Sequence, residues 1–198
     1  YNLIKKMFNF TKKALSSTKI HIGLDEAYNL GLGNYLINNG YHKQKALFIN
    51  HLKKVKELAL AAGYQEILLW SDMFVKLSFN IKSYYETFDL DKVSKPLPLN
   101  NLNLVYWDYY NIDQNRVASN IDLHLKLTKN TTFASGIWIW QRPVVDVNKT
   151  FDTTKVAIEE ASKKGLANMN FTLWNDNGGY CNPDDFLMCM PKISEQIF

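Results

Sequence analysis

Short apolar runs rich in β-branched and aromatic residues alternate along the chain with longer stretches in which apolar residues recur every three or four positions. The first pattern is typical of buried strands, and the second is typical of helices with one apolar face. Their alternation predicts an α/β protein built from βα units around a parallel sheet. The expected strands are residues 19–23, 66–70, 104–107, 132–138 and 168–174.

The clearest helix is predicted between the first two strands, where Gly63 is expected to end it in a left-handed conformation. A second helix is expected to begin after Asp113 as its N-cap, and a third to follow Asp152 and stop before Gly165. Residues 78–103 are predicted to form a long loop excursion within one domain. The apolar stripe of the first helix consists of Phe48, Leu52, Val55, Ala59 and Ala62.

The composition indicates an ordinary globular domain, because 198 residues that are 46% hydrophobic and 21% charged can bury a core. The net charge of +4 comes mostly from scattered lysines, with no arginine cluster interleaved with aromatic residues. No run approaches the roughly 18 apolar residues of a membrane span. We therefore expect neither nucleic acid nor a membrane as a partner. The two cysteines, Cys181 and Cys189, match neither a disulfide framework nor a zinc site, which favours a cytoplasmic location.

Tryptophan and acidic residues gather where the predicted strands end. Asp25 and Glu26 follow the first strand, and Asp72, Asp108 and Asp176 each follow a tryptophan by one or two residues. The carboxyl ends of parallel strands share one face, which is where such proteins build their sites. All five tryptophans lie at or just beyond a strand end: Trp70, Trp107, Trp138, Trp140 and Trp174.

Aromatic walls combined with carboxylates are typical of a sugar site. The apolar C–H face of a pyranose stacks on an indole ring, and its hydroxyls donate hydrogen bonds to carboxylates. The residues therefore predict carbohydrate binding. The two adjacent acids also make carbohydrate cleavage a hypothesis.

The hexapeptide "HIGLDE", residues 21–26, resembles the His-x-Gly-x-Asp-Glu signature of glycoside hydrolase family 20, the β-N-acetylhexosaminidases. The segments "AYNLGLGNYL", "LWSDMF", "LVYWDYY" and "LWNDNGGYC" follow in the order found in a bacterial branch of that family, so the resemblance covers about residues 17–182. It implies a (β/α)8 TIM barrel in which the acidic pair ends the fourth strand. Residues 1–198 would then hold the fourth to eighth units of a partial catalytic barrel domain, because a complete barrel takes about 250 residues. We expect the missing half-barrel or another chain to supply the absent units.

The resemblance also implies a reaction. Family 20 enzymes release terminal β-linked N-acetylglucosamine or N-acetylgalactosamine with the substrate's own acetamido oxygen as nucleophile. Glu26 would be the general acid and base, and Asp25 would accept a hydrogen bond from the acetamido N–H. The substrate is therefore a glycan or amino sugar, and no metal or organic cofactor is implied. Both the gluco and the galacto configuration stay open.

Further roles follow from the same resemblance. Asp176 would bind the 4- and 6-hydroxyls, and Tyr109, with Tyr110 as an alternative, would donate to the acetamido oxygen. Asp72 would either contact a hydroxyl or order its loop. His21 would hydrogen-bond beside the catalytic pair without transferring a proton. The residues expected to wall the acetamido pocket and support the ring are Trp70, Trp107 and Trp174.

Two other functions fit the same residues. The chain could be a non-catalytic fragment that binds N-acetylhexosamine through its tryptophans but lacks turnover. It could also be a glycosidase with a conventional carboxylate nucleophile, for which the N-acetyl group would be dispensable. Turnover that depends on Glu26 and on the acetamido group separates these hypotheses.

Overall fold

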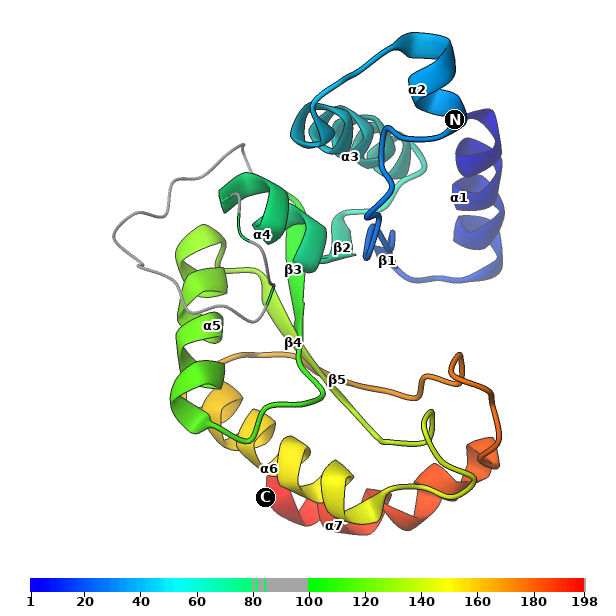
Figure 1. Ribbon diagram of the computed structural model, residues 1–198. Coiled ribbons are helices and arrows are strands. Elements are labelled where there is room, and N and C mark those ends of the chain that lie inside the picture. The colour runs from blue at the N-terminus through cyan, green and yellow to red at the C-terminus, as the bar shows by residue number, and fades with distance from the viewer. Residues whose placement is uncertain (80, 82–83, 85–99, 198) are drawn as a thin grey trace. The chain divides into compact units, whose positions relative to one another are not determined.

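The computed structural model describes residues 1–79, 81, 84 and 100–197 (Figure 1). Most of the excursion predicted over residues 78–103 lies outside the described residues. In chain order the elements are α1 (Asn2–Ala14), β1 (Lys19–His21), α2 (Asn34–Asn39), α3 (Gln44–Ala61), β2 (Glu66–Trp70), α4 (Asp72–Phe79), β3 (Leu102–Trp107), α5 (Gln114–Leu127), β4 (Thr131–Gly136), α6 (Val147–Lys163), β5 (Met169–Thr172), the 3₁₀ helix η2 (Pro183–Met188) and α7 (Met190–Ile197).

The five strands are hydrogen-bonded in the order β1-β2-β3-β4-β5, which is also their order along the chain. Strand β1 pairs in parallel with β2, with Lys19 opposite Glu66, and β4 pairs in parallel with β5, with Phe133 opposite Met169. All five predicted strands are confirmed, with small differences at their ends. The chain is therefore a mixed α/β protein with a parallel five-stranded sheet, which is compatible with part of a (β/α) barrel.

The described residues divide into two compact units, with unit 1 ending at Leu104 and unit 2 beginning at Val105. In unit 1, α1 lies against α3 (Figure 1). The Phe8 ring meets the Tyr64 ring edge-on at 6.2 Å. Helix α3 buries most of its predicted stripe, although Ala62 lies half-buried beyond the helix end. Gly63 has a φ of 94°, which confirms the predicted left-handed end.

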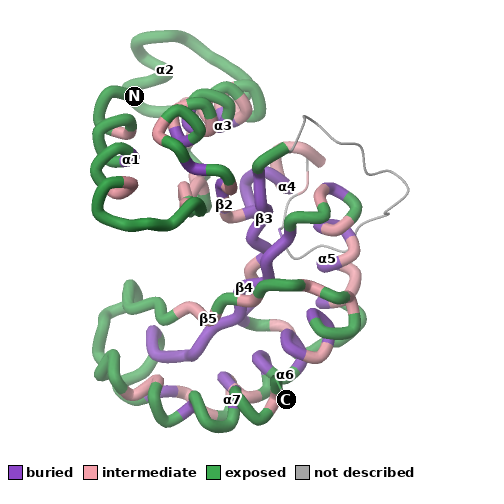
Figure 2. The backbone as a smooth tube through the Cα atoms, turned by 180° about the vertical axis from the view of Figure 1, so that it is seen from behind, coloured by how far each residue is buried: buried purple, intermediate pink, exposed green. Residues whose placement is uncertain are grey.

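In unit 2, helix α6 contacts β4, α5 and α7, and every residue of β4 is buried (Figure 2). The predicted N-cap of α5 is confirmed, because the Asp113 carboxylate accepts the backbone N–H groups of Asn115 and Arg116. The predicted start of α6 after Asp152 is wrong. The helix begins at Val147 because the Asp146 carboxylate accepts the Lys149 N–H at 3.2 Å, which leaves Asp152 inside the helix.

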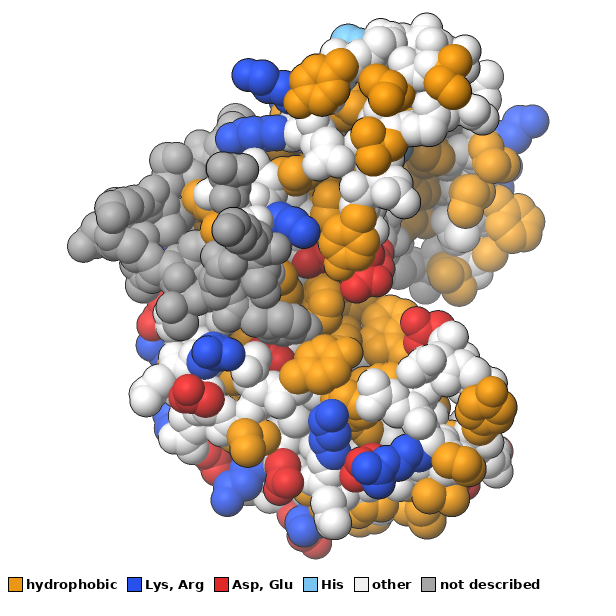
Figure 3. Space-filling view, in the orientation of Figure 1, with side chains coloured by type: hydrophobic (Ala, Val, Ile, Leu, Met, Phe, Trp, Pro, Cys, Tyr) orange, Lys and Arg blue, Asp and Glu red, His pale blue; other side chains and the backbone are white. Residues whose placement is uncertain are grey.

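Unit 1 exposes apolar side chains on its α1 surface. Leu3, Met7 and Phe10 recur at helical spacing and are all more than half exposed, while Phe8 packs inward. Figure 3 shows apolar side chains at the surface of this unit. The apolar arc of α1 is therefore wider than the part that α3 covers. Among the described helices, none combines the length and the apolar character needed to cross a membrane.

Candidate functional site

The predicted acidic pair lies in a strained loop. Strand β1 ends at His21, and residues 22–33, the carboxylate loop, carry Asp25 and Glu26 with both side chains exposed. Leu24 and Glu26 have φ values of 76° and 47°, in the left-handed region that residues with a Cβ avoid at a cost of about 1–2 kcal/mol each. Because the strand ends before the pair, the two neighbouring acids are not forced onto opposite faces of a sheet.

A buried carboxylate holds this strained backbone. Asp72 begins α4 and is only 4% exposed, and its Oδ2 accepts the backbone N–H of Glu26 at 2.9 Å. A negative charge in the first turn of a helix is also favoured by the helix dipole. The hydrogen bond ties the carboxylate loop to the start of α4, while the two roles expected for Asp72, a contact with a sugar hydroxyl or the ordering of its own loop, stay predictions.

Tyr28 lies beside the acidic pair. Its hydroxyl donates to Oε1 of Glu26 at 3.2 Å, and the Lys76 ammonium lies 4.9 Å from the centre of its ring. The Gln44 side chain donates to the backbone carbonyls of Tyr28 and Leu30 at 3.2 and 3.1 Å. Partial burial, followed by the charge of Glu26 and the hydrogen bond to it, raises the pKa of Tyr28 to about 12. The phenol therefore stays a hydrogen-bond donor at neutral pH.

His21 lies near the same loop as a neutral ring. The Gly23 N–H donates to its Nδ1 at 3.1 Å, so the single proton of the neutral imidazole lies on Nε2. Burial lowers the pKa of His21, and the charge of Asp25 partly opposes that effect. The imidazole packs against Trp70, with 4.5 Å between the ring centres. His21 therefore links the end of β1 to the end of β2.

Unit 2 carries an aromatic cluster formed by Trp107, Tyr109, Trp138 and Trp140. Trp107 stacks on Tyr109 at 5.3 Å, and Trp138 stacks on Trp140 at 4.3 Å. The Trp138 Nε1–H donates to the Tyr109 carbonyl at 2.9 Å, which fixes the indole in the cluster. Tyr109, Trp138 and Trp140 are buried, whereas Trp107 is half-buried. Trp107 is thus the member of the aromatic cluster with the most surface for a ligand.

The predicted tyrosines differ in exposure. Tyr109 is buried in the aromatic cluster, whereas Tyr110 is 47% exposed and meets Trp138 edge-on at 5.2 Å. The Lys149 ammonium lies over the Trp138 ring, 3.5 Å from its centre, and 5.6 Å from the Tyr110 ring. The choice between the two tyrosines as donor to the acetamido oxygen stays a prediction.

The acids that follow the tryptophans have different roles. Asp108 is buried, and it accepts the Tyr106 hydroxyl at 2.9 Å and the N–H groups of Tyr110 and Asn111 at 3.0 and 3.1 Å. It organises the loop after β3, much as Asp72 holds the carboxylate loop. Asp176 instead lies exposed after an exposed Trp174. Some of the acids that follow a tryptophan therefore serve to order a loop.

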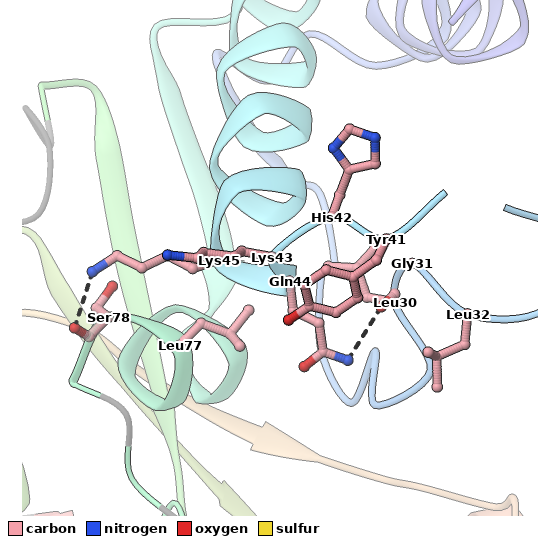
Figure 4. A pocket seen from close by; sticks show the side chains of 10 residues that line it. All are labelled: Leu30, Gly31, Leu32, Tyr41, His42, Lys43, Gln44, Lys45, Leu77 and Ser78. Atoms are coloured by element: carbon pink, nitrogen blue, oxygen red, sulfur yellow. Dashed lines mark hydrogen bonds between the residues drawn. The ribbon is translucent and has the colours of Figure 1, made fainter. Parts of the chain in front are cut away.

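Unit 1 also contains a pocket of about 410 Å³ between residues 30–32, 41–45 and 77–78 (Figure 4). The Lys45 ammonium donates to the Ser78 carbonyl across it at 3.3 Å. Gln44 lines the pocket and donates to the Leu30 carbonyl, so one wall is joined to the carboxylate loop (Figure 4). None of the predicted site residues lines this pocket.

Within unit 1, hydrogen bonds and ring contacts join Glu26 to Asp72 and His21 to Trp70. Tyr28 and Gln44 are absent from the sequence-based prediction, because contacts made by a loop leave no periodic pattern. In the part of the chain that the structure describes, no three His, Cys, Asp or Glu side chains are grouped to hold a metal ion. Neither a protein-family model nor a curated protein matches this chain.

Proposed function

We propose that this chain acts as an exo-β-N-acetylhexosaminidase, which hydrolyses terminal β-linked N-acetylglucosamine or N-acetylgalactosamine by substrate-assisted, retaining catalysis. The observation that carries the proposal is the exposed Asp25–Glu26 pair in a strained loop that Asp72 holds by the Glu26 N–H. Strain of this kind persists where surrounding contacts enforce it, and it is concentrated at functional sites.

The two carboxylates take different roles in this reaction. Glu26 protonates the glycosidic oxygen while the acetamido carbonyl oxygen of the substrate attacks the anomeric carbon. Asp25 accepts the acetamido N–H, which orients that group and stabilises the positive charge of the oxazolinium intermediate. Glu26 then removes a proton from the water that opens the intermediate. The exposure of both side chains leaves them accessible to a substrate.

The residues proposed to contact the sugar, as the resemblance implies, are Trp70, Trp107, Trp174 and Asp176. Flat indole surfaces suit the C–H face of a pyranose, and Asp176 is exposed for hydroxyl recognition. Tyr109 or Tyr110 completes the acetamido contacts.

The proposed framework is a TIM barrel in which the five strands form the fourth to eighth βα units. The sequential strand order and the parallel pairs support it, as does the acidic pair just beyond the carboxyl end of β1. Three further βα units, in the same polypeptide or in another chain, would close such a barrel.

The test is hydrolysis of a chromogenic N-acetyl-β-glucosaminide by the product of the complete reading frame, with the 198-residue chain beside it. The β-linked disaccharide of N-acetylglucosamine is measured beside it, and on that substrate Glu26→Gln should lower kcat by about 10²-fold or more, because the sugar leaving group must be protonated and general acid catalysis contributes about that much. The matched control is Glu57→Gln, since Glu57 is an exposed glutamate on α3. Among the described residues, its ion pair is with Lys54.

Three results would contradict the proposal. Full activity of Glu26→Gln on the disaccharide would show that Glu26 is not the general acid. Equal turnover of the matching glucoside, which carries a 2-hydroxyl, would indicate a conventional carboxylate nucleophile. Binding of N-acetylglucosamine without any turnover would leave the non-catalytic sugar-binding function.

A further inference from the structure

We infer that Tyr28 is a positioning residue for the proposed acid and base: its hydroxyl holds the Glu26 carboxylate and stabilises the negative charge that Glu26 gains as the leaving group is protonated. This inference rests on the proposed function. It gives a role to a residue to which the resemblance assigns none.

The structure fixes Tyr28 from two sides. Gln44 donates from one side-chain amide to the carbonyls of Tyr28 and Leu30, so the backbone on both sides of residue 29 is tied to the start of α3 (Figure 4 shows the bond to Leu30). The Lys76 ammonium, from α4, lies 4.9 Å from the ring centre. From this position the hydroxyl donates to Oε1 of Glu26 at 3.2 Å.

The bond gains strength as the reaction proceeds. In the first step the O–H bond of protonated Glu26 breaks, and its proton forms a new bond to the glycosidic oxygen. The electrons of the breaking C–O bond pass to that oxygen, and Glu26 becomes a carboxylate. A phenol O–H donates more strongly to a carboxylate than to a neutral acid, so Tyr28 stabilises the transition state more than the ground state.

The charges around Tyr28 help to keep its hydroxyl protonated. Asp25 and Asp72 are both close enough to the phenol to help raise its pKa. The Lys76 ammonium lies against the face of the Tyr28 ring. Among the described residues, the Tyr28 hydroxyl donates a hydrogen bond to the Glu26 side chain.

The inference predicts a dependence on the leaving group. A nitrophenol departs with little protonation, whereas a sugar hydroxyl must be protonated as it leaves. Tyr28→Phe should therefore lower kcat about tenfold on the β-linked disaccharide of N-acetylglucosamine, and less than about twofold on the nitrophenyl glycoside, with KM nearly unchanged.

Tyr41→Phe is the matched control, because Tyr41 is a largely exposed tyrosine at the rim of the pocket in the same unit. Gln44→Met is a second variant, which keeps the phenol but removes both carbonyl bonds. It should show a smaller loss with the same preference for the disaccharide. Folding of each variant is checked by its urea unfolding curve.

A loss of the same factor on both substrates would overturn the inference, because it would indicate a purely structural role. Wild-type rates for Tyr28→Phe on the disaccharide would overturn it as well. If Glu26→Gln is inactive while Tyr28→Phe matches wild type, only this inference fails. If Glu26→Gln is fully active, the proposed function fails, and the inference fails with it.

Discussion

The stability of the chain should fall between pH 7 and pH 5 because of one buried histidine. His124 lies in α5, is fully buried, and packs its ring against Tyr106 at 4.9 Å between centres. Its Nδ1 lies 2.6 Å from the Asn120 carbonyl, so the N–H of the neutral ring donates there. Burial lowers the pKa of His124 from 6.5 to about 4, an effect that the hydrogen bond to Asn120 only partly opposes.

The sign and size follow from linkage. The unfolded chain takes up a proton near pH 6.5, whereas folded His124 stays neutral down to about pH 4. The contribution to the free energy of unfolding is therefore fully present above pH 6.5 and is lost as the pH falls toward 4. pH 5 lies about 1.5 pH units below the pKa of this histidine in the unfolded chain. At about 1.36 kcal/mol per unit, protonation therefore stabilises the unfolded state by about 2 kcal/mol.

The assay is urea unfolding followed by tryptophan fluorescence, since four of the five tryptophans lie in unit 2 with His124. His124→Gln should be less stable at pH 7 but should lose about 2 kcal/mol less than wild type between pH 7 and pH 5. The comparison matters because burial also lowers the pKa of His21 and His51. His42→Gln, at an exposed site, is the control and should keep the wild-type slope. Equal losses in wild type and His124→Gln would refute the reasoning.

Three further changes test the packing around the site. Gly136→Ala would place a Cβ 2.6 Å from the Trp140 ring, and it should lower the free energy of unfolding by about 1–3 kcal/mol. Unchanged stability together with an unchanged near-UV circular dichroism spectrum would show that the ring can move to make room. Asp108→Ala leaves buried donors without their acceptor, and it should lower the free energy of urea unfolding by about 3 kcal/mol. A loss below about 1 kcal/mol would contradict the role of Asp108 in ordering its loop. Asp72→Ala should speed hydrogen exchange at the Glu26 amide roughly tenfold or more, and an unchanged rate would show that this bond does not hold the loop.

The strands could be predicted because each is marked by a short apolar run in its own sequence. The run "EILLW" matches β2 residue for residue, and α3 buries four apolar residues of its predicted stripe. The start of α6 was not predictable from Asp152, because Asp146 is an equally good cap and lies six residues earlier. Helices α1, α2, α4, η2 and α7 were not among the predicted elements. Helices α2, α4, η2 and α7 have only six to eight residues, too few for a repeated apolar pattern to stand out. Helix α1 has 13 residues and a clear apolar face, which the prediction missed.

The candidate site was predictable only at the level of residue types. A strand followed by two acids could be read from "KIHIGLDE", and β1 ends before the pair as that reading requires. The left-handed backbone at Leu24 and Glu26 could not be predicted from the sequence, because it depends on the carboxylate of Asp72, which is distant along the chain and holds the loop. Gln44 is likewise separated from Tyr28 by α2 and makes its contacts only in the folded unit.

Burial separates the strand-end acids into two groups with different chemical roles. Asp72 and Asp108 are buried and accept backbone N–H groups, so their charge is already used to hold loops. Exposed acids at the same ends are Asp25, Glu26 and Asp176, whose oxygens a ligand can reach. A buried carboxylate that gives up its backbone donors for a ligand would leave those donors unsatisfied at a cost of about 1–3 kcal/mol each. The proposed catalysis therefore depends on the exposed acids, and among the buried ones Asp72 holds the backbone of Glu26.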